Sequence, residues 1–122
     1  MDTVFLIEDN PQTCLLLDRL LRDSFEVVIA KTPAEALEKV EQIVPALILM
    51  DIDLNARRNG TELLKTFREE QKIDETVPVM ALTAYALPGD RERFLDSGFD
   101  SYVSKPFTRE ILMKEIDALL ED

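Results

Sequence analysis

The sequence contains no histidine and no tryptophan among its 122 residues, and it contains a single cysteine. Without histidine, the chain lacks the commonest general base and the commonest ligand for transition metals. The lone Cys14 cannot form a disulfide within the chain, and its apolar helical surroundings predict a buried packing role rather than a reactive thiol. Any chemistry must therefore use carboxylates, a hydroxyl group or lysine.

Basic residues are also few, because 14 Lys and Arg stand against 25 Asp and Glu, for a formal charge of −11. This balance disfavours the backbone of a nucleic acid or an anionic lipid surface as a partner. The sequence has neither a signal-like N-terminus nor an apolar run long enough to span a membrane. We therefore expect a cytoplasmic protein that binds cations or basic protein surfaces, with no membrane insertion and no direct nucleic-acid binding.

What the chain does contain is a regular alternation of short apolar segments and helical patterns, within a composition that is 46% hydrophobic and 32% charged. Such alternation is typical of repeated strand and helix units. The segments are apolar on both faces, as in a parallel sheet covered by helices on both sides. We expect one α/β domain over residues 1–122, with five helices and with strands at residues 3–7, 27–30, 46–50, 77–82 and 101–104. Asn10-Pro11, Thr32-Pro33 and Thr108 are typical helix starts.

Polar residues follow four of the expected strands. Glu8 and Asp9 come after the first strand, Asp51 after the third, Thr83 after the fourth and Lys105 after the fifth. The carboxyl ends of parallel strands lie at one edge of a sheet, which is where open α/β folds bind ligands. We therefore expect these five side chains to meet in one crevice.

Three carboxylates in one crevice repel one another, and a divalent cation relieves that repulsion. Oxygen ligands without histidine or thiolate suit Mg²⁺. A carboxylate beside Mg²⁺, with a hydroxyl group and an ammonium nearby, can accept a phosphoryl group and stabilise its oxygens. Each signal has a simpler interpretation by itself, such as a helix cap at Asp9-Asn10-Pro11, a polar turn after Asp51 or a solvated charge at Lys105. Their joint placement favours an aspartyl-phosphate site.

The same segments resemble the response-regulator receiver family of bacterial two-component signalling, and the resemblance covers essentially the whole chain. The fold that it implies is a flavodoxin-like five-stranded parallel sheet of order 2-1-3-4-5, with five helices on both faces. The matching segments are Leu6-Ile7-Glu8-Asp9-Asn10, Leu47-Ile48-Leu49-Met50-Asp51, Ala81-Leu82-Thr83-Ala84 and Tyr102-Val103-Ser104-Lys105-Pro106-Phe107.

The resemblance assigns a metal site to the acidic residues. It implies that Glu8 and Asp9 hold Mg²⁺, and that Asp51 is the phosphoacceptor and also coordinates the metal. The backbone carbonyl of Asp53 would supply a further ligand.

The resemblance also assigns roles around the phosphoryl group. Thr83 corresponds to the hydroxyl residue that moves toward the phosphoryl group, and Lys105 to the cation that pairs with it. Tyr102 corresponds to an aromatic residue that turns inward with that movement. The Lys105-Pro106 bond matches one that the family keeps in the cis form.

The implied function is a signalling switch. A histidine kinase or histidine phosphotransfer protein would donate a phosphoryl group from phosphohistidine to Asp51. The face formed by the fourth helix, fifth strand and fifth helix would then change for a downstream protein effector. The protein would not be a conventional enzyme, since it would catalyse only its own phosphorylation and dephosphorylation. No output domain is expected after Asp122, which leaves a stand-alone regulator and the receiver of a hybrid kinase as alternatives.

Two departures from the family pattern lie shortly after the acceptor. Asp53 is acidic where the family often has a neutral side chain, and residues 55–59 precede Gly60 without a proline. Asp53 and Tyr85 stand two positions after the acceptor and the hydroxyl residue, beside the path of the hydrolytic water. A bulky Tyr85 and a repelling Asp53 predict slow self-dephosphorylation.

The alternative from another class is an aspartyl-phosphate hydrolase or another small α/β enzyme, such as a flavin carrier. A flavin site needs a phosphate-binding loop rich in Ser, Thr and Gly, and Glu8-Asp9-Asn10-Pro11 would repel phosphate there. A hydrolase needs an acid–base residue two positions after its nucleophile, where Asp53 stands. Hydrolysis of phosphoesters would distinguish this enzyme from a receiver.

Overall fold

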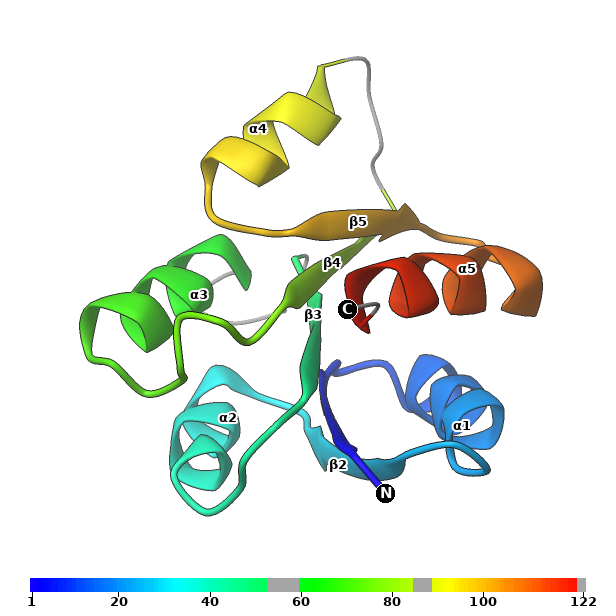
Figure 1. Ribbon diagram of the computed structural model, residues 1–122, viewed down its shortest axis with the longest axis horizontal. Coiled ribbons are helices and arrows are strands. Elements are labelled where there is room, and N and C mark those ends of the chain that lie inside the picture. Colours follow the sequence, from blue (N-terminus) through cyan, green and yellow to red (C-terminus); the bar gives the residue numbers. More distant parts are fainter. Residues whose placement is uncertain (53–59, 85–88, 121–122) are drawn as a thin grey trace.

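The protein folds into a five-stranded parallel sheet with helices on both faces (Figure 1). The computed structural model describes residues 1–52, 60–84 and 89–120. The strands pair in the order β2-β1-β3-β4-β5, which confirms the expected flavodoxin-like arrangement. Their bounds are Thr3–Ile7 for β1, Glu26–Ala30 for β2, Leu47–Asp51 for β3, Val79–Thr83 for β4 and Ser101–Ser104 for β5.

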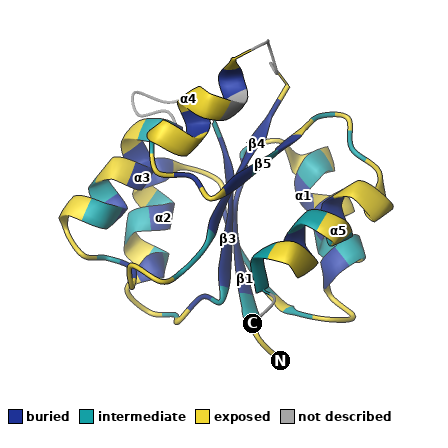
Figure 2. Cartoon of the chain, turned by 45° about the horizontal axis from the view of Figure 1, so that its top comes forward, coloured by how far each residue is buried: buried dark blue, intermediate teal, exposed yellow. Residues whose placement is uncertain are grey.

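Helices cover the sheet on two sides. In Figure 2, α1 and α5 lie on one side of the buried sheet, and α2, α3 and α4 lie on the other. The five helices are α1 (Pro11–Leu21), α2 (Pro33–Val40), α3 (Gly60–Glu69), α4 (Asp90–Asp96) and α5 (Arg109–Leu120). The central strand β3 is buried along its whole length, as its continuous apolar sequence predicts.

The two faces of the sheet form two separate apolar cores because successive side chains of a strand point to opposite faces. On β3, Ile48 and Met50 pack with α2, α3 and α4. Leu47 and Leu49 of the same strand pack with α1 and α5. The two cores therefore hold the helices against both faces of the sheet.

The expected helix starts are confirmed at the first two helices. The Asn10 side chain accepts hydrogen bonds from the backbone N–H groups of Gln12 and Thr13 at the start of α1. The Thr32 hydroxyl accepts one from the Glu35 N–H at the start of α2. Both caps satisfy N–H groups that the helix itself leaves unpaired, so α1 and α2 begin at fixed points after β1 and β2.

Three strands, β2, β3 and β4, end or begin at slightly different residues from those predicted, and two of these differences concern the site. Asp51 and Thr83 are the last residues of β3 and β4, rather than the first residues beyond them. Asp51 still pairs in register with Leu82, and Thr83 with Ser104. The sheet ladder itself therefore holds the backbone of both residues in place.

Candidate functional site

The four chain segments carrying the predicted site meet at the carboxyl edge of the sheet. Glu8 and Asp9 follow β1, Asp51 and Thr83 end β3 and β4, and Lys105 follows β5. The Lys105 N–H donates to the Thr83 carbonyl at 2.7 Å, which continues the β4–β5 pairing into the loop. The structure thus places these residues at one edge of the sheet.

Three acidic side chains form a cluster in the site. Glu8, Asp9 and Asp51 each place one carboxylate oxygen within 4.8 Å of the others. Glu8 and Asp51 are buried, with 0% and 3% of their surface exposed, while Asp9 is half-buried. Three converging oxygen donors, two of them withdrawn from water, fit a hard divalent cation such as Mg²⁺.

Glu8 is the most constrained member of this cluster. Its Oε1 accepts from the Asn10 N–H at 3.2 Å, and its Oε2 accepts from the Lys105 ammonium at 3.0 Å. Its main-chain N–H donates to the Ala30 carbonyl, and its own carbonyl accepts from the Cys14 thiol at 3.2 Å. Burial and the charge of Asp51 raise the pKa of Glu8 to about 7, although the contacts with Lys105 and Asn10 act in the other direction.

Lys105 lies between two carboxylates. Its Nζ is 3.0 Å from Glu8 Oε2 and 3.5 Å from Asp51 Oδ2. Burial opposes its positive charge, but the hydrogen bond to Glu8 and the charge of Asp51 outweigh burial, so the pKa of Lys105 is raised. The ammonium is therefore charged at neutral pH and stands beside Asp51, where it can pair with an oxygen added to that carboxylate. The Lys105-Pro106 peptide bond that follows is cis, as the family resemblance implies.

Cys14 takes the packing role expected from the sequence. It is 5% exposed, and burial together with the nearby negative charge of Glu8 raises the pKa of its thiol. The thiol is thus protonated at neutral pH and unsuited to nucleophilic chemistry.

An apolar groove of about 350 Å³ adjoins the acidic cluster. Its lining residues come from α1, the position after β4 and the segment after β5, and they are Thr13, Leu16, Ala84, Lys105, Pro106 and Phe107. Leu15 and Leu16 on α1 are about half exposed, at 51% and 47%. A surface that joins exposed leucines to a charged site is typical of protein partners rather than of small polar ligands.

Of the other predicted residues, the structure describes Tyr102 but not Asp53 or Tyr85. Tyr102 is half-buried on β5, and its ring packs against that of Phe94 from α4, with centroids 5.7 Å apart. Asp53 and Tyr85 lie outside the described residues, so the metal-ligand role of Asp53 and the lifetime role of both residues stay predictions.

Two residues that contact the predicted site residues were not expected from the sequence. The Asn10 N–H binds the Glu8 carboxylate, although Asn10 was expected only to start a helix. Phe94 packs on Tyr102, and its separation of eight positions from that residue carries no local periodic signal. Both contacts depend on backbone geometry that residue types alone do not specify.

Comparison with known proteins identifies the family. The sequence pattern of the response regulator receiver domain matches residues 4–117. The chain belongs to the response regulator receiver family. It is therefore a receiver domain of two-component signalling, a family of signalling modules rather than of typical enzymes.

Similar receivers match the chain over nearly its full length. The polar-differentiation response regulator DivK of Brucella ovis is 33% identical over 121 residues, covering 98% of this chain and 97% of that protein. The receiver domain of a sensor histidine kinase from Pseudomonas aeruginosa is 31% identical, with a TM-score of 0.85 and coverage of 99% and 98%. Its structure has a magnesium ion coordinated in the active site cleft. Chemotaxis protein CheY4 of Vibrio cholerae is 25% identical, with a TM-score of 0.88 and coverage of 98% and 99%.

Receivers bind Mg²⁺ at an acidic site, and Glu8, Asp9 and Asp51 form such a cluster here. Among the described residues, none of the helices has the length and apolar character needed to cross a membrane.

Proposed function

We propose that this receiver accepts a phosphoryl group on Asp51. The observation that carries the proposal is the position of Asp51 at the end of the central strand. There its buried carboxylate faces Glu8 and Asp9 and lies 3.5 Å from the Lys105 ammonium. A carboxylate in this setting has both a nucleophilic oxygen and a cation nearby to stabilise the charge of the transferred group.

The proposed reaction breaks the N–P bond of a phosphohistidine and forms an O–P bond to Asp51, and the donor imidazole leaves. Lys105 lies close enough to Asp51 to pair with one of the phosphoryl oxygens. Thr83, buried at the end of the adjacent strand, supplies a hydroxyl group from the same edge. Mg²⁺, held by Glu8, Asp9 and Asp51 with the Asp53 carbonyl as a further ligand, would neutralise oxygen charge during transfer.

The proposed donor is a histidine kinase or a histidine phosphotransfer protein. The apolar groove with Leu16, Pro106 and Phe107 supports a protein donor, because it gives a docking surface beside Lys105. We further propose that residues 1–122 act as one cytoplasmic domain, and that the α4–β5–α5 face changes for a protein effector when Asp51 is phosphorylated. The charge of −11 supports basic protein surfaces over nucleic acid as partners.

The proposal limits catalysis to self-phosphorylation and self-dephosphorylation. A hydrolase would turn over external phosphoesters such as p-nitrophenyl phosphate, whereas this receiver should not. Continuous release of p-nitrophenol that is lost in Asp51→Asn would support the hydrolase instead.

The direct test is intact mass spectrometry after treatment with acetyl phosphate. Wild type with Mg²⁺ should gain one phosphoryl group, and it should gain little when EDTA replaces the metal. Asp51→Asn should gain none, while Asp23→Asn, at an exposed carboxylate after α1, should behave as wild type. Equal phosphorylation of wild type and Asp51→Asn would overturn the assignment.

A further inference from the structure

Lys31 lies at the carboxyl edge of the sheet, beside the acidic cluster. It directly follows Ala30, the last residue of β2, and the carbonyl of the peptide group that joins the two residues accepts from the Glu8 N–H at 3.0 Å. β2 runs parallel to β1, with Ala30 opposite Ile7. The main chain of Lys31 therefore leaves the sheet next to that of Glu8 and Asp9.

The main chain of Lys31 is held from both sides. On one side is the hydrogen bond between its preceding carbonyl and Glu8. On the other side α2 begins, where the Thr32 hydroxyl accepts from the Glu35 N–H at 3.1 Å. The hydrogen bond from Lys39 lowers the pKa of Glu35, and the N–H group and the charge of Lys31 add to this effect. The exposed Lys31 side chain thus starts from a fixed point at the edge of the site.

The charge of Lys31 acts inside the site. The Cys14 thiol donates to the Glu8 carbonyl at 3.2 Å, so it lies where the electrostatic field of the acidic cluster is strong. Burial and the charge of Glu8 raise the pKa of this thiol, whereas the charge of Lys31 and, more weakly, that of Lys105 oppose the rise. At this position Lys31 therefore acts more strongly than the lysine of the site itself.

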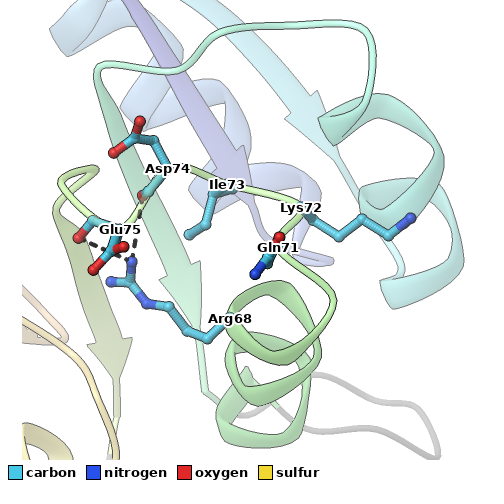
Figure 3. A pocket seen from close by; sticks show the side chains of 6 residues that line it. All are labelled: Arg68, Gln71, Lys72, Ile73, Asp74 and Glu75. Atoms are coloured by element: carbon cyan, nitrogen blue, oxygen red, sulfur yellow. Dashed lines mark hydrogen bonds between the residues drawn. The ribbon is translucent and has the colours of Figure 1, made fainter.

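Lys31 takes part in no ion pair among the residues that the structure describes, in contrast to Arg68 at the opposite edge of the sheet. The Arg68 guanidinium is 3.7 Å from Asp100 Oδ2. It also donates to the carbonyls of Asp74 and Glu75 at 3.5 and 3.4 Å, beside a hollow of about 720 Å³ (Figure 3). Arg68 is thus occupied within the chain, whereas the Lys31 ammonium is available to an ion from solution.

From these observations we infer that Lys31 is a specificity-determining residue that attracts anionic phosphodonors to the site. In the strand order β2-β1-β3, one strand separates Lys31 from Asp51. Their main chains are therefore about 10 Å apart, which is about one Debye length at 0.1 M salt. Lys105 lies on the β5 side of the acidic cluster and Lys31 on the β2 side, so a cation stands on each side of it. A phosphoryl group that approaches three carboxylates is repelled, and a cation at the rim reduces that repulsion and speeds association.

The same position makes Lys31 oppose the binding of Mg²⁺, because two cations beside one cluster repel each other. Removal of the Lys31 charge therefore has two effects of opposite sign. An anionic phosphodonor reacts more slowly, whereas Mg²⁺ binds more tightly. A local loss of structure would weaken both, so the pair of measurements separates an electrostatic role from a structural one.

The inference rests on the proposed phosphorylation of Asp51, and its test compares wild type with Lys31→Gln using two small donors. At neutral pH acetyl phosphate is a dianion and phosphoramidate is a monoanion. Rates are followed by intact mass at saturating Mg²⁺ with no other added salt and with the donor well below saturation. Lys31→Gln should react about threefold more slowly with acetyl phosphate, and less than about twofold more slowly with phosphoramidate. The difference should disappear in about 1 M salt, where the Debye length is about 3 Å.

Lys114→Gln is the matched control, because it removes the same charge from an exposed lysine on α5. It should react as wild type does with both donors, and Lys31→Arg should keep the wild-type rate because it keeps the charge. Melting temperatures in a Mg²⁺ titration provide the second measurement. The Mg²⁺-induced shift should be larger in Lys31→Gln than in wild type and unchanged in Lys114→Gln.

Equal rates for Lys31→Gln and Lys114→Gln with acetyl phosphate would overturn the inference. A loss of rate that persists at high salt, or that accompanies weaker Mg²⁺ binding, would overturn it as well. Failure of the proposed function looks different, because wild type would then gain no mass with either donor. The Mg²⁺ titration still decides in that case: an unchanged shift in Lys31→Gln would reject the action of Lys31 on the site, and a larger shift would support it.

Discussion

The Lys105 ammonium donates to the Glu8 carboxylate at 3.0 Å across 97 positions of sequence. One residue follows the first strand and the other follows the last, so the contact ties β1 and β5 to the central Asp51. The same ammonium lies 3.5 Å from Asp51 and offsets part of the negative charge of the cluster. The remaining charge has consequences that can be measured.

The metal-free protein should lose stability as pH rises from about 5 to about 7. Burial and the charge of Asp51 raise the pKa of Glu8 from 4.5 to about 7 in the folded chain. Between these values the folded state holds a proton that the unfolded chain has released, so the free energy of unfolding decreases with increasing pH and levels off above about 7. The decrease from this group should reach at most about 3 kcal/mol.

Urea unfolding in EDTA at pH 5, 6, 7 and 8 measures this effect. Glu8→Gln should remove most of the decrease, because its amide does not titrate in this range. Glu26→Gln, at an exposed position on β2, should keep the wild-type slope. Parallel curves for wild type and Glu8→Gln would show that Glu8 is not the group responsible.

Mg²⁺ should raise the melting temperature of the unphosphorylated protein, because it relieves repulsion among Glu8, Asp9 and Asp51. Asp9→Ala should lose most of this shift and should also melt higher than wild type in EDTA. Asp23→Ala provides the control, since that exposed carboxylate lies outside the cluster. A metal-induced shift that survives in Asp9→Ala would place the binding site elsewhere.

Gly60→Ala should distort the acceptor segment. A Cβ at Gly60 would lie 2.6 Å from the Asp51 carbonyl oxygen and 2.8 Å from the Ile52 Cα, so the backbone must move. We expect a loss of about 1–3 kcal/mol in stability and a reduced Mg²⁺-induced shift. In Gly89→Ala, the new Cβ meets no atom within 4 Å, and the positive φ alone should lower stability while leaving the Mg²⁺ shift intact. Equal Mg²⁺ shifts in the two variants would contradict this account.

Self-dephosphorylation should be slow because Asp53 and Tyr85 are predicted to flank the path of the attacking water. Tyr85→Ala should open that path, and Asp53→Asn should remove a charge that repels a hydroxide-like nucleophile. Decay of the phosphorylated form at saturating Mg²⁺ would be followed by intact mass. A change below about twofold in both variants, worth only about 0.4 kcal/mol of barrier, would show that neither side chain shields the site.

The sequence predicted the strand order only through the family resemblance, but it predicted the strands themselves from local pattern. The continuous apolar run before Asp51 indicated a strand buried on both faces, and β3 is buried throughout. Strand ends were less accurate, since Asp51 and Thr83 belong to the strands. Their last hydrogen bonds depend on neighbouring strands, which local composition does not reveal.

By itself the sequence determined the types of residue available and the edge of the sheet where they gather. Alternating strands and helices place Glu8, Asp9, Asp51, Thr83 and Lys105 at the carboxyl ends of parallel strands, whatever the details of packing. Only the tertiary structure decided how they pair: Lys105 with Glu8 at 3.0 Å, Asn10 with the other oxygen of Glu8, and Phe94 with Tyr102. Local patterns are set by neighbours in sequence, whereas these contacts depend on the distances between separate loops and helices, which are fixed only when the two cores pack.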